Sequence, residues 1–231
     1  MQHPFEKLFE FSWHYNLNHL DEDIDIVYNN WSPSDWQYEH REVITFDKFY
    51  LPCKQYFADS SVLDLGCGIG WSSFWALHYG AKSVIGIDTN KKRIPIANWL
   101  SKKLHYNDKT NFYNLDICDN IDHLLYSTDT VFLSYVIQRH VPQVDLFERI
   151  NDSRVKKIIL FDEYEQLDEQ HPYIKYDMFD TSNNGEGYDP NVIRGIPNQK
   201  FYKTLLEDRL GWTCQRREIF DYLWFGVWER I

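Results

Sequence analysis

The chain has 231 residues, 43% of them hydrophobic, which is the composition of a globular protein long enough to bury a core. Its formal net charge is −11, with 24 Lys and Arg residues against 35 Asp and Glu. Proteins that bind nucleic acids neutralise phosphates with Lys and Arg. The acidic balance therefore argues against a nucleic-acid ligand.

The four cysteines are scattered and include no Cys-x-x-Cys pair, so we expect neither a disulfide framework nor a metal site. The N-terminus contains acidic residues and has no apolar region of the kind that a secretory signal carries. No apolar run reaches the length of about 18 residues that a membrane span needs. These features predict a cytoplasmic protein with no membrane partner. They give no prediction of its oligomeric state.

The N-terminal residues 1–57 are predicted to form a helical lid rich in aromatic side chains. Apolar residues recur near helical spacing over 4–20, and a second helix is expected over 43–50. The segment between these helices is first acidic and then aromatic. Within it, Tyr28 and Trp31 are candidates for a wall of the substrate site.

Residues 58–231 are predicted to form an α/β core in which strands alternate with helices. Strands are expected near 61–65, 83–88, 111–115, 129–136 and 155–162, and helices near 70–79, 91–106, 119–125 and 142–150. The alternation predicts a parallel sheet with helices on both faces. Residues 163–198 are polar, aromatic and turn-rich, and we expect a cap insertion there. A helix near 199–210 and two β runs joined by a turn are expected to follow.

A glycine turn follows the first predicted strand, in the motif V-L-D-L-G-C-G-I-G at residues 62–70. Glycines let the backbone bend sharply and approach a ligand closely. Asp88 ends the second strand about 20 residues after the turn, where an acidic side chain accepts hydrogen bonds from a ribose. The spacing is G-x-G-x-G, whereas dinucleotide sites carry G-x-G-x-x-G. Asp64 would repel a diphosphate and attract an ammonium group, so a ligand that joins adenosine to a zwitterion is favoured over a nicotinamide dinucleotide.

This motif resembles the first motif of the class I S-adenosylmethionine-dependent methyltransferases. The resemblance covers about 55–162 in its rhythm of strands and helices, and the C-terminal β runs fit that family's terminal hairpin. It implies a Rossmann-like α/β fold, with a mostly parallel seven-stranded sheet, helices on both faces and a C-terminal antiparallel hairpin. It also implies S-adenosyl-L-methionine as the cofactor.

Carried over by position, the resemblance assigns the cofactor to residues at the ends of four strands. These are Asp64, Gly66, Cys67, Gly68 and Gly70 around the methionine part, Asp88 and Thr89 at the ribose, Asp116 and Ile117 at the adenine, and Ser134 and Tyr135 beneath the sulfonium. Cys67 is interpreted as a small residue in a tight turn instead of a nucleophile.

Methyl transfer from a sulfonium is an in-line displacement, so the protein mainly has to align the reacting atoms. A hydroxyl or ammonium acceptor also needs a base. His140, just after the fourth strand, is the first candidate, with a surface or helix-capping histidine as the alternative. Asp162 and Glu163, at the end of the fifth strand, are the other catalytic candidates. His171 and Tyr173, in the cap, are candidates for binding the substrate.

The sequence lacks the N/D-P-P-Y/F signature of DNA amino-methyltransferases and the cysteine pair of enzymes that methylate base carbons. Together with the acidic charge, these absences favour a small polar metabolite as acceptor: a sugar, an amine or an amino-acid derivative. Transfer of the aminocarboxypropyl arm, or cyclisation of the cofactor, is an alternative on the same fold. A non-catalytic cofactor-binding partner subunit and an RNA methyltransferase are the others.

Overall fold

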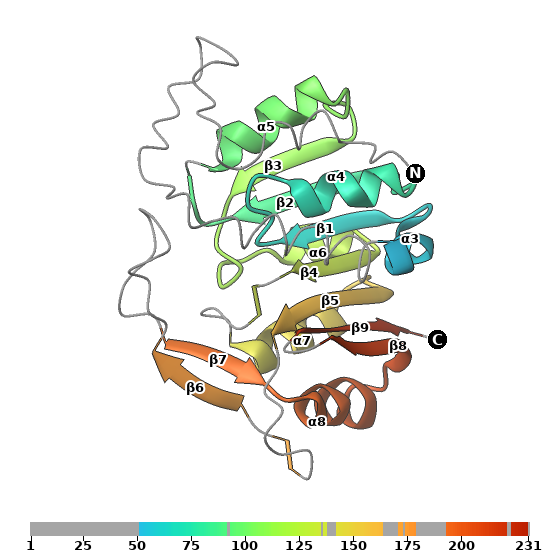
Figure 1. Ribbon diagram of the computed structural model, residues 1–231, viewed down its shortest axis with the longest axis vertical. Helices are drawn as coiled ribbons and strands as arrows, with labels where there is room; N and C mark the ends of the chain where they lie inside the picture. The colour runs from blue at the N-terminus through green and yellow to red at the C-terminus, as the bar shows by residue number, and fades with distance from the viewer. Residues whose placement is uncertain are drawn as a thin grey trace.

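The computed structural model describes residues 51–91, 93–134, 136–137, 142–163, 171–172, 174–178, 193–220 and 223–230 (Figure 1). Most of the predicted lid lies outside the described residues, as do the two helices expected within it. Five of the predicted site residues lie outside them too, namely Tyr28, Trp31, Tyr135, His140 and Tyr173. Glu163 is described as part of a strand, without its side chain.

A seven-stranded sheet forms the centre of the described part, in the order β3-β2-β1-β4-β5-β9-β8. Its strands are β1 (Ser61–Leu65), β2 (Ser83–Asp88), β3 (Thr110–Asn114), β4 (Thr130–Ser134), β5 (Lys157–Glu163), β8 (Thr213–Phe220) and β9 (Leu223–Glu229). The first five strands are mutually parallel. β9 pairs antiparallel with both β5 and β8. The predicted fold class, including the C-terminal antiparallel hairpin, is confirmed.

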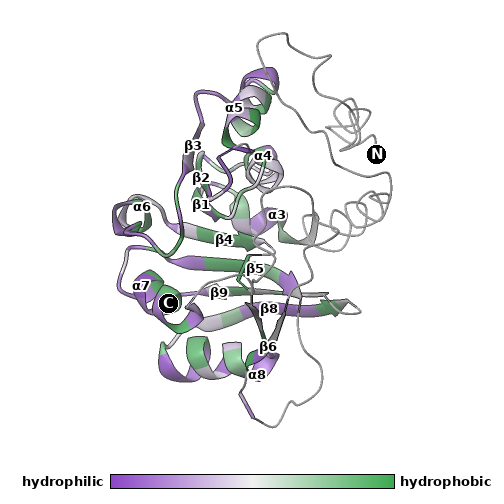
Figure 2. Ribbon diagram, turned by 90° about the vertical axis from the view of Figure 1, so that its left-hand side faces the viewer, coloured by the Kyte–Doolittle hydropathy of each residue, from purple (hydrophilic) through white to green (hydrophobic). Residues whose placement is uncertain are grey.

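Helices cover both faces of this sheet (Figure 2). One face carries α3 (Leu51–Phe57), α4 (Trp71–His78) and α5 (Arg93–Lys103), and the other carries α6 (Asp122–Ser127), α7 (Gln143–Asn151) and α8 (Gln199–Tyr202), which continues as a π-helix, η4 (Lys203–Arg209). Neighbouring strand residues point to opposite faces, so Phe132 packs in the first cluster while Val131 and Leu133 pack in the second. Two apolar layers thus enclose the sheet.

The β3–α6 connection is longer than the sequence predicts, because polar side chains form turns in it. The Asp116 Oδ1 accepts a hydrogen bond from the Cys118 N–H, and the Asn120 Oδ1 accepts one from the Asp122 N–H. Asp and Asn side chains compete in this way with helical hydrogen bonds. Helix α6 therefore begins at Asp122, later than the expected start near 119.

A second, two-stranded sheet lies within the predicted cap insertion. β6 (Ile174–Met178) pairs antiparallel with β7 (Ile193–Pro197), beyond the carboxyl end of β5 (Figure 1). Two buried amides join this pair to the core: the Gln143 Nε2 donates to the Gly195 carbonyl at 3.0 Å, and the Asn198 Nδ2 donates to the His171 carbonyl at 2.8 Å. The sequence predicted turns here, although the alternating apolar residues of IKYDM are a weak strand signal.

We predict that Gly86→Ala destabilises the protein through the packing between β2 and β3. A Cβ added to Gly86 would lie 2.5 Å from the Phe112 Cδ1 and 2.9 Å from the Cys67 Sγ, both in the buried core. Overpacking of this kind lowers the free energy of unfolding by about 1–3 kcal/mol. Urea unfolding measures the loss. Phe112→Leu, added to this variant, should cost less than it does in the wild type, because the obstructing ring is gone. Simple additivity of the two losses would contradict the packing described.

Candidate functional site

The candidate site lies at the carboxyl edge of the parallel strands, where four predicted cofactor segments meet. Strand register sets the ends of β1, β2, β3 and β4 side by side: Leu65 pairs with both Ile87 and Leu133, and Asp88 pairs with Asn114. Open α/β sheets bind their ligands in the crevice outside this edge. The structure therefore brings together segments that lie far apart in the sequence.

The glycine turn after β1 is held by the end of β2. Gly66, Gly68 and Gly70 all have left-handed backbones, with φ of 76°, 58° and 91°. The N–H groups of Gly66 and Cys67 both donate to the Ile87 carbonyl, at 2.8 and 2.9 Å. The Gly68 N–H donates to the Asp88 Oδ2 at 2.9 Å. The predicted ribose acceptor and the turn are thus one hydrogen-bonded unit.

Two of these glycines meet different surroundings. A Cβ added to Gly66 would lie 2.5 Å from the Val136 Cγ2, so this position takes no larger residue and packs against the segment after β4. A Cβ added to Gly68 would meet a single described atom within 4 Å, the Arg93 Nη1 at 4.0 Å. The backbone at Gly68 therefore borders space that a ligand could fill, which fits the implied cofactor.

Asp64 lies beneath the turn and is fully buried. Its Oδ2 accepts hydrogen bonds from the Ser72 and Ser73 hydroxyls, at 2.6 and 2.5 Å, in the first turn of α4. Its Oδ1 has no hydrogen-bond partner in the described part of the chain. Burial raises the pKa of Asp64 to about 6, against the lowering effect of the two serine hydroxyls. An ammonium group bound above the turn would be attracted to the ionised form.

The Asp88 carboxylate makes structural hydrogen bonds and can accept further ones from a ligand. Its Oδ1 accepts from the Asn90 N–H at 2.7 Å, and the Arg93 Nη1 lies 3.7 Å from its Oδ2. An ionised carboxylate offers about four acceptor sites, so hydroxyl donors can still be accommodated. The Asn114 Nδ2 donates to the carbonyls of Asp88 and Thr89, both at 2.9 Å, and so ties β3 to the end of β2.

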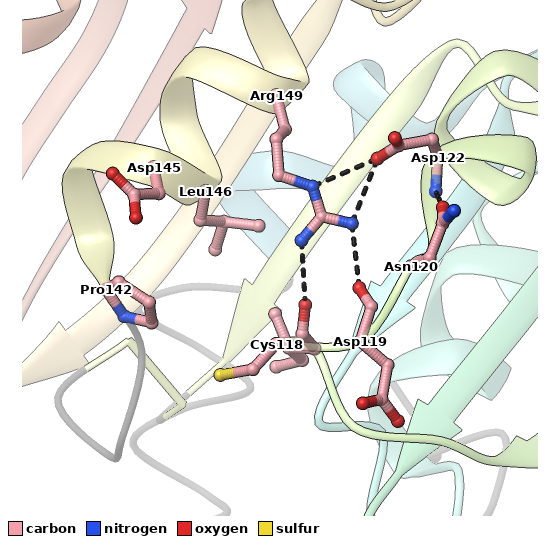
Figure 3. Close-up of a pocket in the computed structure, with 9 residues that line it drawn as sticks. Cys118, Asp119, Asn120, Asp122, Pro142, Asp145, Leu146 and Arg149 are labelled. Atoms are coloured by element: carbon pink, nitrogen blue, oxygen red, sulfur yellow. Dashed lines mark hydrogen bonds and ion pairs between the residues drawn. The ribbon is translucent and has the colours of Figure 1, made fainter.

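Asp116 and Ile117 occupy the segment after β3, next to a hollow of about 370 Å³ (Figure 3). Asp116 is exposed, whereas Ile117 is buried. The hollow separates this segment from the first turns of α7 and is bordered by Arg149. Sequence reasoning missed Arg149, since its only sequence signal is a basic residue in the last turn of a helix.

Cys67 is nearly inaccessible, with 4% of its surface exposed. Burial raises the pKa of its thiol well above the usual range, and the nearby Asp64 carboxyl raises it further. Because the thiolate is the nucleophilic form, this environment disfavours covalent chemistry. The geometry fits the interpretation of Cys67 as a small residue in a tight turn.

The carboxyl end of β5 places Asp162 in a buried polar network. The Asp162 Oδ2 accepts from the Ile137 N–H at 3.0 Å, and the Gln143 Nε2 donates to the Ile137 carbonyl at 3.1 Å. Tyr202 lies close to Asp162, and its pKa is raised well above the usual range, mainly by burial and then by that carboxyl. Asp162 therefore holds the segment after β4, and Ser134, the last residue of β4, is half-buried.

The last predicted site residue that the structure describes is His171, and the predictions on a metal and on a membrane concern the same part of the chain. His171 is exposed, and its carbonyl accepts the hydrogen bond from Asn198. Within the described residues, no three His, Cys, Asp or Glu side chains are grouped so that they could hold a metal ion. In the same part of the chain, no helix has the length and apolar character needed to cross a membrane.

A family model described as a methyltransferase domain matches residues 57–208, which is more than half of the chain. An uncharacterized protein from Methanocaldococcus jannaschii, MJ0284, is 41% identical over 69 residues. That match covers 30% of this chain and 31% of the archaeal protein, so it relates about a third of each.

Two solved structures illustrate the shared fold. An S-adenosylmethionine dependent methyltransferase from Mesorhizobium loti has a TM-score of 0.58 at 16% identity, over 78% of this chain and 96% of that one. Magnesium protoporphyrin IX methyltransferase from Synechocystis, crystallised with bound SAH, has a TM-score of 0.58 at 19% identity, over 86% of each chain. At these identities the likeness shows the fold.

The raised pKa of Asp64 predicts a pH-dependent stability. An unfolded Asp ionises near 3.8 and the folded one near 6, so between these pH values the folded chain binds more protons. This stabilising contribution is complete below about pH 4 and is lost as the pH rises through 6, a change of about 3 kcal/mol. Asp64→Asn cannot ionise and should lack the change. Urea unfolding at pH 4 and pH 7.5 compares the two; an equal difference between variant and wild type at both would refute the raised pKa.

Proposed function

Because the chain belongs to the family of methyltransferase domains, we propose that it transfers the methyl group of S-adenosylmethionine to a small polar metabolite. The resemblance to class I S-adenosylmethionine-dependent methyltransferases is confirmed by the family match and the fold. The observation that carries the proposal is the glycine turn hydrogen-bonded to the carboxylate of Asp88 at the carboxyl edge of the sheet. This hydrogen bond connects the turn, where a ligand can approach the backbone closely, to a carboxylate that can accept hydrogen bonds from ribose hydroxyls.

In the proposed complex, residues at the strand ends bind different parts of the cofactor. The cofactor supplies a methyl group that is activated by its positively charged sulfur. Asp88 accepts hydrogen bonds from the ribose, and the open side of Gly68 admits the methionine part. The charge of Asp64 favours the ammonium group. Asp116 accepts from the adenine amino group and Ile117 packs against the ring. These contacts bind and orient the cofactor, which is the main requirement of an in-line transfer.

A sugar, an amine or an amino-acid derivative is the proposed acceptor class. The net charge of −11 disfavours a polyanionic acceptor such as RNA. The cap insertion, which includes β6 and β7, lies beyond the strand end that carries Asp162, and we propose that it contributes to binding the acceptor. The structurally similar protein from Synechocystis is named for magnesium protoporphyrin IX, which supports a small molecule as acceptor, although a porphyrin lies outside the polar class proposed here.

For the chemical step we propose His140 as the base that takes the acceptor's proton. The segment that carries His140 follows Ile137, whose main chain is held on both sides by Asp162 and Gln143. We therefore propose that Asp162 acts by positioning this segment, while Glu163 remains a candidate for contact with the acceptor. The aromatic lid of residues 1–57, with Tyr28 and Trp31, and the cap of 163–198, with His171 and Tyr173, would close over the acceptor and exclude water.

We predict that S-adenosylhomocysteine stabilises the protein. At 100 times its dissociation constant the ligand should add about 2.7 kcal/mol, which raises the melting temperature by roughly 5–10 °C. Asp88→Asn should abolish most of this shift because it removes the charged ribose acceptor. Asp108→Asn makes the same charge change on an exposed residue before β3, at the opposite edge, and should retain the shift. A comparable shift with NADH and none with S-adenosylhomocysteine would overturn the cofactor assignment.

We predict that the purified protein forms S-adenosylhomocysteine from S-adenosylmethionine only when a pooled metabolite extract is added. Mass spectrometry should then find an extract component that has gained one methyl group, which identifies the acceptor. Asp88→Asn serves as the control with impaired cofactor binding. If methylthioadenosine forms instead, the aminocarboxypropyl arm is the part that reacts. Cofactor binding without any turnover would favour a non-catalytic partner subunit.

A further inference from the structure

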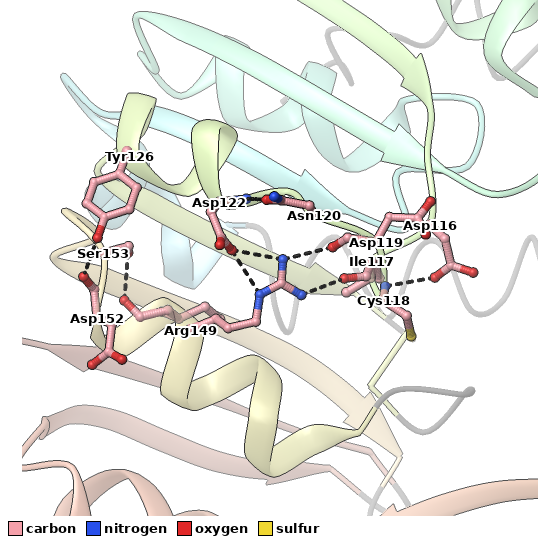
Figure 4. Close-up of polar contacts among 11 residues, drawn as sticks. Asp116, Ile117, Cys118, Asp119, Asn120, Asp122, Tyr126, Arg149, Asp152 and Ser153 are labelled. Atoms are coloured by element: carbon pink, nitrogen blue, oxygen red, sulfur yellow. Dashed lines mark hydrogen bonds and ion pairs between the residues drawn. The ribbon is translucent and has the colours of Figure 1, made fainter.

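Arg149, in the last turn of α7, contacts the segment after β3 at three points (Figure 4). Its Nη1 donates to the Ile117 carbonyl at 3.2 Å, and its Nη2 donates to the Asp119 carbonyl at 2.8 Å. Its Nε donates to the Asp122 Oδ1 at 3.0 Å, which completes an ion pair. One guanidinium thus binds two main-chain carbonyls and a carboxylate that all belong to residues 117–122.

The hydrogen bonds of Arg149 restrict the backbone of residues 117–122, because this segment borders a hollow and is not closely packed on that side. The hollow is lined by Ile117 and Cys118 on one side and, on the other, by Leu146 of α7 and by Pro142, which precedes this helix (Figure 3). Where a protein interior is closely packed, packing alone restricts the backbone. Over this hollow that restriction is weaker, so the donors of Arg149 replace it.

The position of Asp116 depends on the same stretch of main chain. Its Oδ1 accepts from the Cys118 N–H at 2.9 Å, and its carbonyl accepts from the Asp119 N–H at 3.1 Å. Asp116 is itself exposed, so these local contacts orient its carboxylate. The orientation follows the backbone of residues 117–119, which Arg149 holds at both ends.

We propose that Arg149 is a positioning residue for adenine recognition, which holds residues 116–122 so that Asp116 and Ile117 meet the adenine ring. This rests on the proposed function, since it takes an adenosine-bearing cofactor to bind at this edge. Arg149 touches no reacting atom in this scheme. It acts through the carboxylate that reads the adenine amino group.

The fork of the guanidinium is the feature that this role requires. Lysine carries a single point of charge on a flexible stem and cannot span two carbonyls and a carboxylate with the same geometry. Arg149→Lys should therefore resemble Arg149→Ala. Arg209→Ala is the matched control, because Arg209 forms an ion pair with Glu148, the neighbour of Arg149 in α7, at the protein surface.

The first measurement is the affinity for S-adenosylhomocysteine and for S-inosylhomocysteine, in which an oxygen replaces the adenine amino group, by titration calorimetry. We expect the wild type to prefer the adenosine compound by about tenfold or more, the worth of one hydrogen bond to a charged group. Arg149→Ala and Arg149→Lys should weaken its binding and reduce the preference severalfold. Arg209→Ala should preserve both. A preference that is unchanged in both Arg149 variants would overturn the proposal.

The second measurement is amide hydrogen exchange of the ligand-free protein over residues 115–125. Arg149→Ala should speed exchange at Cys118 and Asp119, whose N–H groups bind Asp116, while Arg209→Ala should not. Unchanged exchange would overturn the claim that Arg149 holds the segment. Faster exchange with an intact adenine preference would make Arg149 a structural brace and overturn its role in recognition. If the wild type binds neither compound, the proposed function fails and the adenine role fails with it, while the exchange data still decide whether Arg149 holds the segment.

Discussion

The hydrogen bond from the Gly68 N–H to the Asp88 carboxylate is the interaction on which the site depends. Three left-handed glycines at alternate positions, Gly66, Gly68 and Gly70, make a turn that glycine permits but does not by itself select. The carboxylate and the Ile87 carbonyl select it, because both belong to β2, which pairs in parallel with β1 on one side and with β3 on the other. The position of the turn is therefore set by strand pairing, and the group that would bind a ribose is the group that shapes the turn.

Asp64, which is buried next to the glycine turn, adds an electrostatic constraint on which ligands can bind there. Its burial costs free energy when it is ionised, and the hydroxyls of Ser72 and Ser73 offset part of that cost while they fix the first turn of α4. A carboxyl group with a pKa near 6 responds strongly to a neighbouring cation. The fold thus keeps a negative charge available at the turn without exposing it to water, which is useful for a zwitterionic ligand and unfavourable for a diphosphate.

The parts of the site that the sequence predicts are those encoded by short-range patterns. The glycine spacing, the apolar runs of β1 and β2, and acidic residues such as Asp88 at strand ends are all local signals. The contacts of Gln143 with Gly195 and of Arg149 with Ile117 join residues that are distant in the chain, and periodicity carries no information about them. The β6–β7 pair was missed for a related reason, since a two-stranded sheet between turn-rich segments leaves only a short alternation to detect.

Helix α7 links the two ends of the site. Gln143, in its first turn, holds the main chain after β4 and the carbonyl of Gly195 in the cap, while Arg149, in its last turn, holds the segment after β3. Gln143 binds only main-chain carbonyls, and Arg149 binds two main-chain carbonyls besides the Asp122 carboxylate, so most of the geometry they fix does not depend on which side chains the held segments carry. A fold arranged in this way can change the residues of its cap, the proposed acceptor site, while the proposed adenine site keeps its position. This separation is consistent with one α/β fold serving many acceptors.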